Sequence, residues 1–227
     1  MRTLALETSF FPGSIALLDG ASCLLGRDLP REQRTTQTLI PTIRTLLAEV
    51  GWEPNHLELI AVSQGPGSFT GLRVGLTTAK TLSYALDTQL LGVSTFAVLA
   101  QQVGIATSTL WAVIDAQRQE VFCQAFSATC GRWEPKQAAQ ILGVDTWLNQ
   151  LQASDWVTGP IVERLEHRLP AQTCLAPPAA RFPLAITCGQ LALQQFLAGE
   201  RQDTFALSPI YGRPSAAEEK AQASESA

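Results

Sequence analysis

The residues from Gly65 to Gly71 form a segment that can bind a phosphate. They read Gly-Pro-Gly-Ser-Phe-Thr-Gly and lie between an apolar segment at 59–63 and a helical pattern at 72–86. A glycine-rich loop between a strand and a helix exposes free N–H groups at the positive end of the helix dipole, which favours an anion by ~0.3–2 kcal/mol. The predicted phosphate ligands are Gly65, Gly67, Ser68 and Thr70.

The same glycines also have two purely structural interpretations. They can form a sharp corner between the strand and the helix, with Ser68 or Thr70 as the helix cap. Alternatively, Gly71 and Gly75 can let the helix pack closely on a sheet or on a partner helix. The loop by itself does not decide between phosphate binding, a corner and close packing.

Two carboxylates, Glu7 and Asp115, are the second feature that could do chemistry. Each stands at the end of a predicted strand that opens one of two similar units of the chain. If the two strands are equivalent, the carboxylates can face each other across a cleft and hold Mg²⁺ with a bound phosphate. In the alternative interpretation, each carboxylate caps its own turn by accepting hydrogen bonds from backbone N–H groups.

Patterns typical of other catalytic sites are missing from the sequence. The two histidines, His56 and His167, are far apart and form no His-x-x-x-His pair for a metal. Lys80 does not belong to a Gly-Lys-Ser/Thr phosphate loop, and Ser68 does not belong to a Gly-x-Ser-x-Gly elbow. Apart from the Mg²⁺-phosphate alternative at Glu7 and Asp115, the sequence therefore predicts no catalytic residue and no metal ligand.

Composition indicates a chain with a proper core and no basic surface. Of its 227 residues, 46% are hydrophobic and 16% are charged, and the net charge is −4. A negative net charge argues against independent binding of nucleic acid. The five cysteines form no Cys-x-x-Cys pair, the N-terminus resembles no signal peptide, and no apolar run approaches ~18 residues. We therefore expect a cytoplasmic protein.

The predicted elements follow a duplicated order, because each unit begins with two strands joined by a turn. The first unit is predicted to contain strands at 4–8, 14–18, 22–26, 59–63 and 89–93 and helices at 40–50, 72–86 and 94–103. The second is predicted to contain strands at 111–115, 120–126 and 156–158 and helices at 145–151, 162–167 and 184–197. The helix at 40–50 is expected to begin near Ile40, since Pro41 is tolerated only in a first turn.

Five blocks of the sequence resemble the TsaB family, and they cover the chain almost from end to end. The most specific is Gly-Pro-Gly-Ser-Phe-Thr-Gly-Leu-Arg at 65–73. The resemblance implies an α/β protein with the actin-like ATPase (ASKHA) fold, built from two RNase H-like halves of which the second is reduced. We expect an N-terminal half at 1–106, a C-terminal half with a final helix at 107–213 and a disordered tail at 214–227. The five matching blocks are 4–9, 63–75, 91–95, 114–121 and 208–215.

The resemblance also implies a role. TsaB proteins are partner subunits of the bacterial complex that makes threonylcarbamoyladenosine beside the tRNA anticodon, and catalysis there belongs to the related subunit TsaD. It implies a non-catalytic activator that binds TsaD as a heterodimer, with the ATPase TsaE as third component. It also implies a capacity for homodimers, contact with tRNA only through the complex, and no membrane association. The alternative is a stand-alone actin-fold ATPase or small-molecule kinase.

The resemblance places the partner surface on two helices of the N-terminal half. TsaB-like proteins pair through these helices, so their apolar and small residues are candidate contacts, although the leucines can instead face the chain's own sheet. No cofactor is expected on the chain alone, and ATP or ADP with Mg²⁺ is expected only at the complex interface. The candidate partner contacts are Leu39, Ile43, Leu47, Gly71, Leu72, Gly75 and Leu76.

Overall fold

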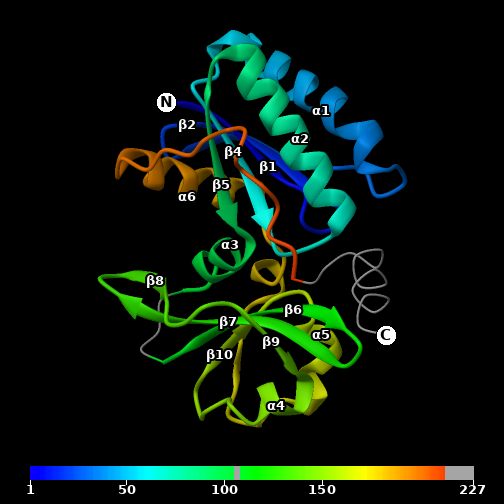
Figure 1. Ribbon diagram of the computed structural model, residues 1–227, viewed down its shortest axis with the longest axis vertical. Helices are drawn as coiled ribbons and strands as arrows, with labels where there is room; N and C mark the ends of the chain where they lie inside the picture. The colour runs from blue at the N-terminus through cyan, green and yellow to red at the C-terminus, as the bar shows by residue number, and fades with distance from the viewer. Residues whose placement is uncertain (105–107, 213–227) are drawn as a thin grey trace, which may run out of the picture.

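The chain folds into two lobes, each built on its own β-sheet (Figure 1). The computed structural model describes residues 1–104 and 108–212, so the tail predicted at 214–227 and the predicted boundary at 106 and 107 lie outside the described residues. The first sheet has the strand order β3-β2-β1-β4-β5. Its strands are β1 (Arg2–Glu7), β2 (Ser14–Asp19), β3 (Ser22–Asp28), β4 (Leu59–Gly65) and β5 (Gln89–Ser94).

The central strands of the first sheet are apolar because helices cover both faces of the sheet. In β1, Leu4 and Leu6 face one cluster of buried residues, and Ala5 faces another. Strands β1 and β2 are antiparallel, whereas β4 and β5 run parallel to β1, so the carboxyl ends of β1 and β4 lie at the same edge. The covering helices are α1 (Thr35–Glu49) and α2 (Phe69–Leu86) on one face and α3 (Thr95–Gln101) and α6 (Ala185–Leu197) on the other.

The second sheet repeats the strand order of the first. Its order is β11-β10-β6-β7-β8, with β6 and β7 antiparallel and β10 and β11 parallel to β6, and β9 also pairs with β7. The duplication predicted from the sequence is therefore confirmed. The second half is reduced, as predicted, because its helices α4 and α5 are short. The elements are β6 (Leu110–Gln117), β7 (Glu120–Thr129), β8 (Arg132–Pro135), β9 (Gln140–Gly143), β10 (Trp156–Thr158), β11 (Cys174–Leu175), α4 (Val144–Leu148) and α5 (Val162–Leu165).

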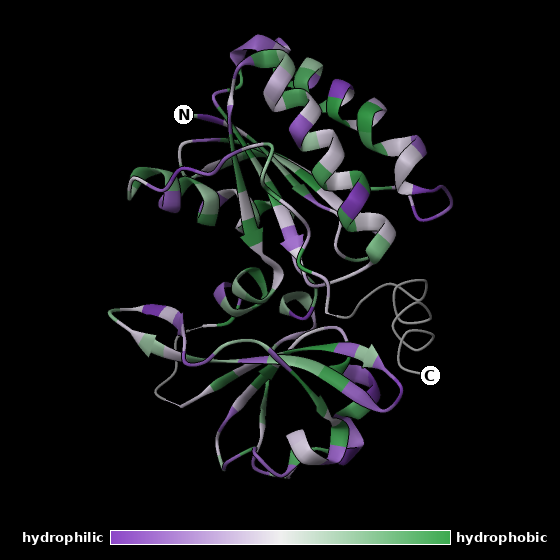
Figure 2. Cartoon of the chain, in the orientation of Figure 1, coloured by the Kyte–Doolittle hydropathy of each residue, from purple (hydrophilic) through white to green (hydrophobic). Residues whose placement is uncertain are grey.

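Helix α6 corrects the predicted division of the chain. The sequence assigns it to the second half, but it packs on the first sheet, where the chain returns after completing the second lobe (Figures 1 and 2). The contact suits small residues. Cys188 and Ala192 on α6 meet Ala5, Ala16 and Ala61 of the sheet, and Gly189 lies so close that a Cβ there would be 2.6 Å from a methyl of Leu18.

Helix α1 begins five residues before the predicted start. The predicted start rested on Pro41, yet the helix runs from Thr35 with Pro41 inside it. Pro41 removes the N–H that would bond the carbonyl of Gln37, and both residues are exposed, so water can satisfy that carbonyl. The Gln37 side chain also accepts a hydrogen bond from the Arg34 N–H at 3.3 Å, which supports the first turn. The sequence also missed the short strands β8, β9 and β11.

The seven residues predicted as partner contacts lie in the chain's own core. Leu39, Ile43, Leu47 and Leu76 belong to the cluster between the first sheet and helices α1 and α2, and Leu72 is fully buried. This corrects the expectation that their side chains meet a partner, because the apolar stripe of each helix faces the sheet. A partner at these helices would contact the exposed residues between them.

Gly71 and Gly75 bring α2 close to the end of β1. A Cβ on Gly71 would lie 2.0 Å from the carbonyl oxygen of Thr8, and a Cβ on Gly75 would lie 2.1 Å from the Thr8 hydroxyl. Neither distance leaves room for a methyl group. The two glycines therefore serve close packing on the chain's own sheet.

We expect Gly71→Ala to lower the free energy of unfolding by about 1–3 kcal/mol, because the added methyl must displace the Thr8 backbone. Gly75→Ala should have a smaller effect, since the Thr8 hydroxyl can rotate. The matched control is Thr77→Ala at an exposed position of α2, expected within about 0.5 kcal/mol of the unaltered protein. Chemical denaturation measures all three. Stabilisation of ~0.5–1 kcal/mol by Gly71→Ala, the usual gain in an open helix, would contradict the packing described here.

Candidate functional site

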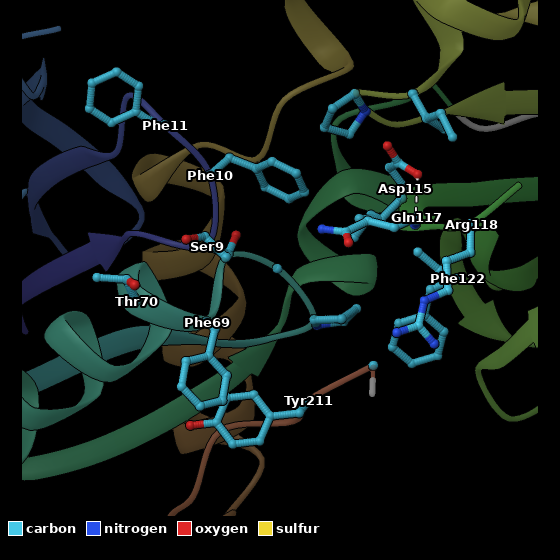
Figure 3. A pocket seen from close by; sticks show the side chains of 18 of the residues that line it. Ser9, Phe10, Phe11, Phe69, Thr70, Asp115, Gln117, Arg118, Phe122 and Tyr211 are labelled. Carbon is cyan, nitrogen blue, oxygen red and sulfur yellow. Dashed lines mark hydrogen bonds between the residues drawn. The ribbon is translucent and has the colours of Figure 1, made fainter. Parts of the chain in front are cut away.

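The two lobes enclose a cleft of ≈ 920 Å³ (Figure 3). Its upper wall comes from the β1–β2 loop and the start of α2, and its lower wall from β6, β7 and the residues around α5. The last described residues of the chain complete the cleft. Its lining consists of Ser9, Phe10, Phe11, Pro66, Gly67, Ser68, Phe69, Thr70, Ile114, Asp115, Ala116, Gln117, Arg118, Phe122, Pro160, Ile161, Arg164, Tyr211 and Gly212.

The glycine-rich loop forms a tightly packed corner at the upper wall. Gly65 has a φ of +115°, and a Cβ there would lie 2.4 Å from the carbonyl oxygen of Ile210. A Cβ on Gly67 would lie 2.4 Å from the carbonyl oxygen of Ser9. Both glycines therefore admit neighbouring backbone. Of the four predicted phosphate ligands, Gly67, Ser68 and Thr70 line the cleft, whereas Gly65 is buried beneath the chain at Ile210.

Ser68 caps helix α2. Its hydroxyl accepts a hydrogen bond from the Gly71 N–H at 3.3 Å, which satisfies one of the free donors of the first turn. The Ser68 N–H donates to the Ser9 carbonyl at 2.7 Å and so is already bonded within the chain. The loop thus forms the corner between strand and helix, with Ser68 as the helix cap. Fewer backbone N–H groups remain free to bind an anion than the sequence suggested.

Glu7 does not reach the cleft. Its side chain is buried, and Oε1 accepts hydrogen bonds from the Ser9 N–H at 2.7 Å and from the Ser9 hydroxyl. Oε2 has no hydrogen-bond partner among the described residues. Burial raises the pKa of Glu7 from 4.5 to about 7, although the hydrogen bonds from Ser9 oppose that shift. The Cys188 thiol of α6 lies on the same side of β1, and both burial and Glu7 raise its pKa.

Asp115 does line the cleft, but it is already paired. Its Oδ1 accepts a hydrogen bond from the Gln117 N–H at 2.8 Å, and its Oδ2 accepts one from Nη1 of Arg164 at 2.8 Å. Each carboxylate therefore bonds the N–H two residues along the chain, at equivalent positions of the two lobes. The interpretation in which each carboxylate caps its own turn is therefore confirmed. The alternative, a pair facing each other across a cleft, is wrong, because Glu7 is buried and only Asp115 is exposed to the cleft.

These carboxylates do not fit a Mg²⁺-nucleotide site. A magnesium site needs carboxylate oxygens free to contact the ion or its waters. The Glu7 side chain is buried and does not reach the cleft, and the Asp115 carboxylate forms an ion pair with Arg164. Within residues 1–104 and 108–212, His, Cys, Asp and Glu also form no cluster of three that could hold a metal ion.

Sequence reasoning missed most of the side chains that give the cleft its character. Phe10, Phe122 and Tyr211 supply aromatic surface, and Arg118 and Arg164 supply positive charge. Arg118 and Tyr211 lie inside blocks that resemble TsaB, at 114–121 and 208–215, but their types alone gave no signal. Only the fold brings these distant segments to one cavity.

Residues 198–212 form a C-terminal strap that runs along β4 and helix α2 to the cleft. The Ile210 N–H donates to the Gln64 carbonyl at 2.8 Å, and Lys80 Nζ donates to the Phe205 carbonyl at 3.0 Å. At its end the Tyr211 ring stacks on Phe69, with 4.5 Å between centroids. Arg73 then lies 3.9 Å from the centre of the Phe69 ring, and its Nε donates to the Tyr211 hydroxyl at 2.8 Å.

Glu7 predicts an unusual pH dependence of stability. The pKa of Glu7 rises from 4.5 to about 7 on folding, so the protonated side chain stabilises the folded state. This contribution to the free energy of unfolding is complete below pH 4.5 and is lost as the pH rises through about 7. We expect the free energy of unfolding to fall by about 2 kcal/mol between about pH 5.5 and about pH 8, and Glu7→Gln to abolish this fall. Denaturant titrations at both pH values measure it, with Asp115→Asn as the matched control that keeps the slope. An unchanged slope in Glu7→Gln would refute the assignment.

Comparisons with known proteins agree with the fold and the sequence blocks. The family model described as TsaD, tRNA N6-adenosine threonylcarbamoyltransferase, matches residues 31–182. YeaZ from Pseudomonas aeruginosa superimposes with a TM-score of 0.76 at 25% identity, over 92% of this chain and 99% of that one. The activator of the 2-hydroxyisocaproyl-CoA dehydratase from Clostridium difficile, with a TM-score of 0.52 at 8% identity over 89% of this chain and 99% of that one, shows the fold alone. The actin-like ATPase fold expected from the resemblance is confirmed.

Curated relatives identify the family. The tRNA threonylcarbamoyladenosine biosynthesis protein TsaB of Bacillus subtilis is 30% identical over 155 residues, which cover 68% of each chain. The protein of the same name from Escherichia coli is 31% identical over 165 residues, which cover 70% of each chain. None of the described helices is long and apolar enough to cross a membrane. The chain belongs to the TsaB family.

Proposed function

We propose that this protein is a cytoplasmic, non-catalytic subunit of a complex that makes threonylcarbamoyladenosine in tRNA. It binds a TsaD-type subunit, and a TsaE-type ATPase completes the assembly. Family membership supports the pathway, since the relatives from B. subtilis and E. coli are named for it. The placement of Glu7 and Asp115 supports a role without catalysis, because the pair that a stand-alone ATPase or kinase would need does not meet.

The exposed face of helix α2 is the observation that carries the docking proposal. Of the 18 residues in α2, only Arg73 and Lys80 are charged, and the C-terminal strap binds both of them. The remaining exposed residues of α2 are uncharged: Thr77, Thr81 and Ala85 are small, and Tyr84 is a large side chain that is 74% exposed. Interface centres are depleted of charge in this way.

Helix α1 extends this face. It lies beside α2 (Figure 1) and leaves the side chain of Ile40 46% exposed. Pro41 and Ala48 are exposed on the same helix. The docking face is thus formed by residues that the sequence did not select, while the selected leucines hold α1 and α2 on the sheet. Two copies of the chain would use the same face to form a homodimer. Formation of the homodimer would therefore compete with binding of the TsaD-type partner.

A nucleotide with Mg²⁺ belongs, in this proposal, to the complex and not to the isolated chain. Asp115 is the one carboxylate in the described lining of the cleft, and Arg164 neutralises it. The partner subunit would therefore supply the acidic ligands. Calorimetry with ATP and Mg²⁺ on the isolated protein tests this directly: heat of binding to the chain alone would overturn it.

We expect Thr81→Glu to weaken binding to the TsaD-type subunit of the same organism by about tenfold or more, because docking would bury an unpaired charge. The matched control is Gln194→Glu, at an exposed position of α6 on the opposite face of the first sheet. Calorimetric titration gives the affinities, and a tRNA modification assay with the complete complex gives the functional effect. Equal affinity of Thr81→Glu and the unaltered protein would exclude this face, and full tRNA modification without this chain would exclude the proposed role.

A further inference from the structure

The two helices of the docking face reverse the charge balance of the chain. The whole chain has 16 lysines and arginines against 20 aspartates and glutamates, and its net charge is −4. Helices α1 and α2 instead contain three basic residues and one acid. The basic residues are Arg44, Arg73 and Lys80, and the acid is Glu49. The two helices thus form a basic surface on an acidic protein.

The single acid of these helices is already paired with a residue outside them. The Glu49 carboxylate accepts two hydrogen bonds from Arg27 of β3, one from Nη1 at 3.0 Å and one from Nη2 at 2.8 Å. This two-point geometry is the strong form of the bond between an arginine and a carboxylate. It ties α1 to the edge strand β3 of the first sheet. Neither α1 nor α2 therefore offers an unpaired carboxylate to another molecule.

The three basic side chains keep their charge and some of their donors. Arg44 is exposed and forms no hydrogen bond or ion pair among the residues that the structure describes. Arg73 donates from Nε to the Tyr211 hydroxyl, which leaves the N–H groups of Nη1 and Nη2. Lys80 donates to the Phe205 carbonyl and has three N–H groups in all. Because both acceptors are neutral, these contacts fix the positions of the charges without cancelling them.

Exposed apolar side chains lie beside these charges. Ile40, one helical turn before Arg44, is 46% exposed. Tyr84, one turn after Lys80, is 74% exposed, and its ring lies 5.9 Å from the equally exposed ring of Phe205. Protein interfaces combine apolar and aromatic anchors with a polar rim in this way. Three cations spread over two helices do not form the dense basic stripe that is typical of nucleic-acid binding, so the pattern favours a protein partner.

Two copies of this face would meet with charges of the same sign. A two-fold interface brings the same surface of both copies together. Each copy would bring Arg44, Arg73 and Lys80 and no unpaired carboxylate from these helices. Like charges placed together across an interface suppress a wrong partner, whereas opposite charges speed the encounter with the right one. A partner that carries carboxylates around its own apolar contact is therefore the better match.

We propose that α1 and α2 recognise a partner surface that carries carboxylates, and that their positive charge disfavours the pairing of two copies. The partner so described is the TsaD-type subunit of the proposed function, on which this proposal rests. The charges set the choice of partner as a difference between two affinities. Salt screens charges beyond ~10 Å at 0.1 M, so added salt should weaken both the attraction and the repulsion.

The test uses the full chain, the TsaD-type subunit of the same organism and the variant Arg44→Glu. The variant should weaken the heterodimer by about tenfold, mostly through a slower association rate. It should strengthen the homodimer by about threefold or more, because each copy then offers a carboxylate to the cations of α2 in the other. Raising the salt from about 0.05 M to about 0.5 M should weaken the unaltered heterodimer by about tenfold and should not weaken the homodimer. Surface plasmon resonance measures the heterodimer, and sedimentation velocity measures the homodimer.

Arg132→Glu is the matched control, since Arg132 is exposed on β8 of the second lobe and its replacement changes the net charge equally. Thermal melting verifies that each variant folds. Equal heterodimer affinity of Arg44→Glu and Arg132→Glu, or a homodimer that Arg44→Glu does not strengthen, would overturn the proposal. Loss of tRNA binding in Arg44→Glu with an unchanged heterodimer would assign the charge to nucleic acid and overturn it as well. If Thr81→Glu weakens the heterodimer and Arg44→Glu does not, the docking face stands and only the role of its charge fails.

Discussion

The close contact of helix α2 with the end of β1 is the constraint on which the rest of the molecule depends. Gly71 and Gly75 remove the two side chains that would separate the helix from Thr8, and Gly67 removes the one that would separate the loop from Ser9. A helix held this near to the sheet edge fixes the upper wall of the cleft. It also fixes the direction of the face that α2 turns to solvent. The specificity of the glycine-rich block as a family marker follows from this packing and requires no bound phosphate.

The same helix separates two surfaces with different chemistry. The C-terminal strap covers one side and binds both charged residues of α2, Arg73 and Lys80. The strap can lie there only because Gly65 admits the Ile210 carbonyl. What remains exposed is an uncharged face suited to a protein partner, and the strap ends with Tyr211 at the cleft. Glycines, strap, docking face and cleft are therefore consequences of one packing arrangement.

Much of the fold could be predicted from the sequence, because its signals are local. Alternating and continuous apolar runs gave most strands, and the paired hairpins gave the duplication. The failures have non-local causes. The predicted start of α1 was too late because it assumed that Pro41 must lie in the first turn. The helix tolerates Pro41 further inside, since the carbonyl that loses its hydrogen bond is exposed to solvent. The place of α6 depends on small residues fitting alanines that lie far away in the sequence, and the aromatic and arginine side chains of the cleft meet only through the fold.

Glu7 and Asp115 show how two copies of one motif came to differ. Both bond the N–H two residues ahead, so the turn itself needs a carboxylate in each lobe. In the first lobe α6 packs over the carboxylate, and burial favours its neutral form. In the second lobe the shorter helices leave the carboxylate open to the cleft, where Arg164 neutralises it. With Glu7 buried and Asp115 paired with Arg164, the two carboxylates do not form the surface suitable for a cation that two free carboxylates would make.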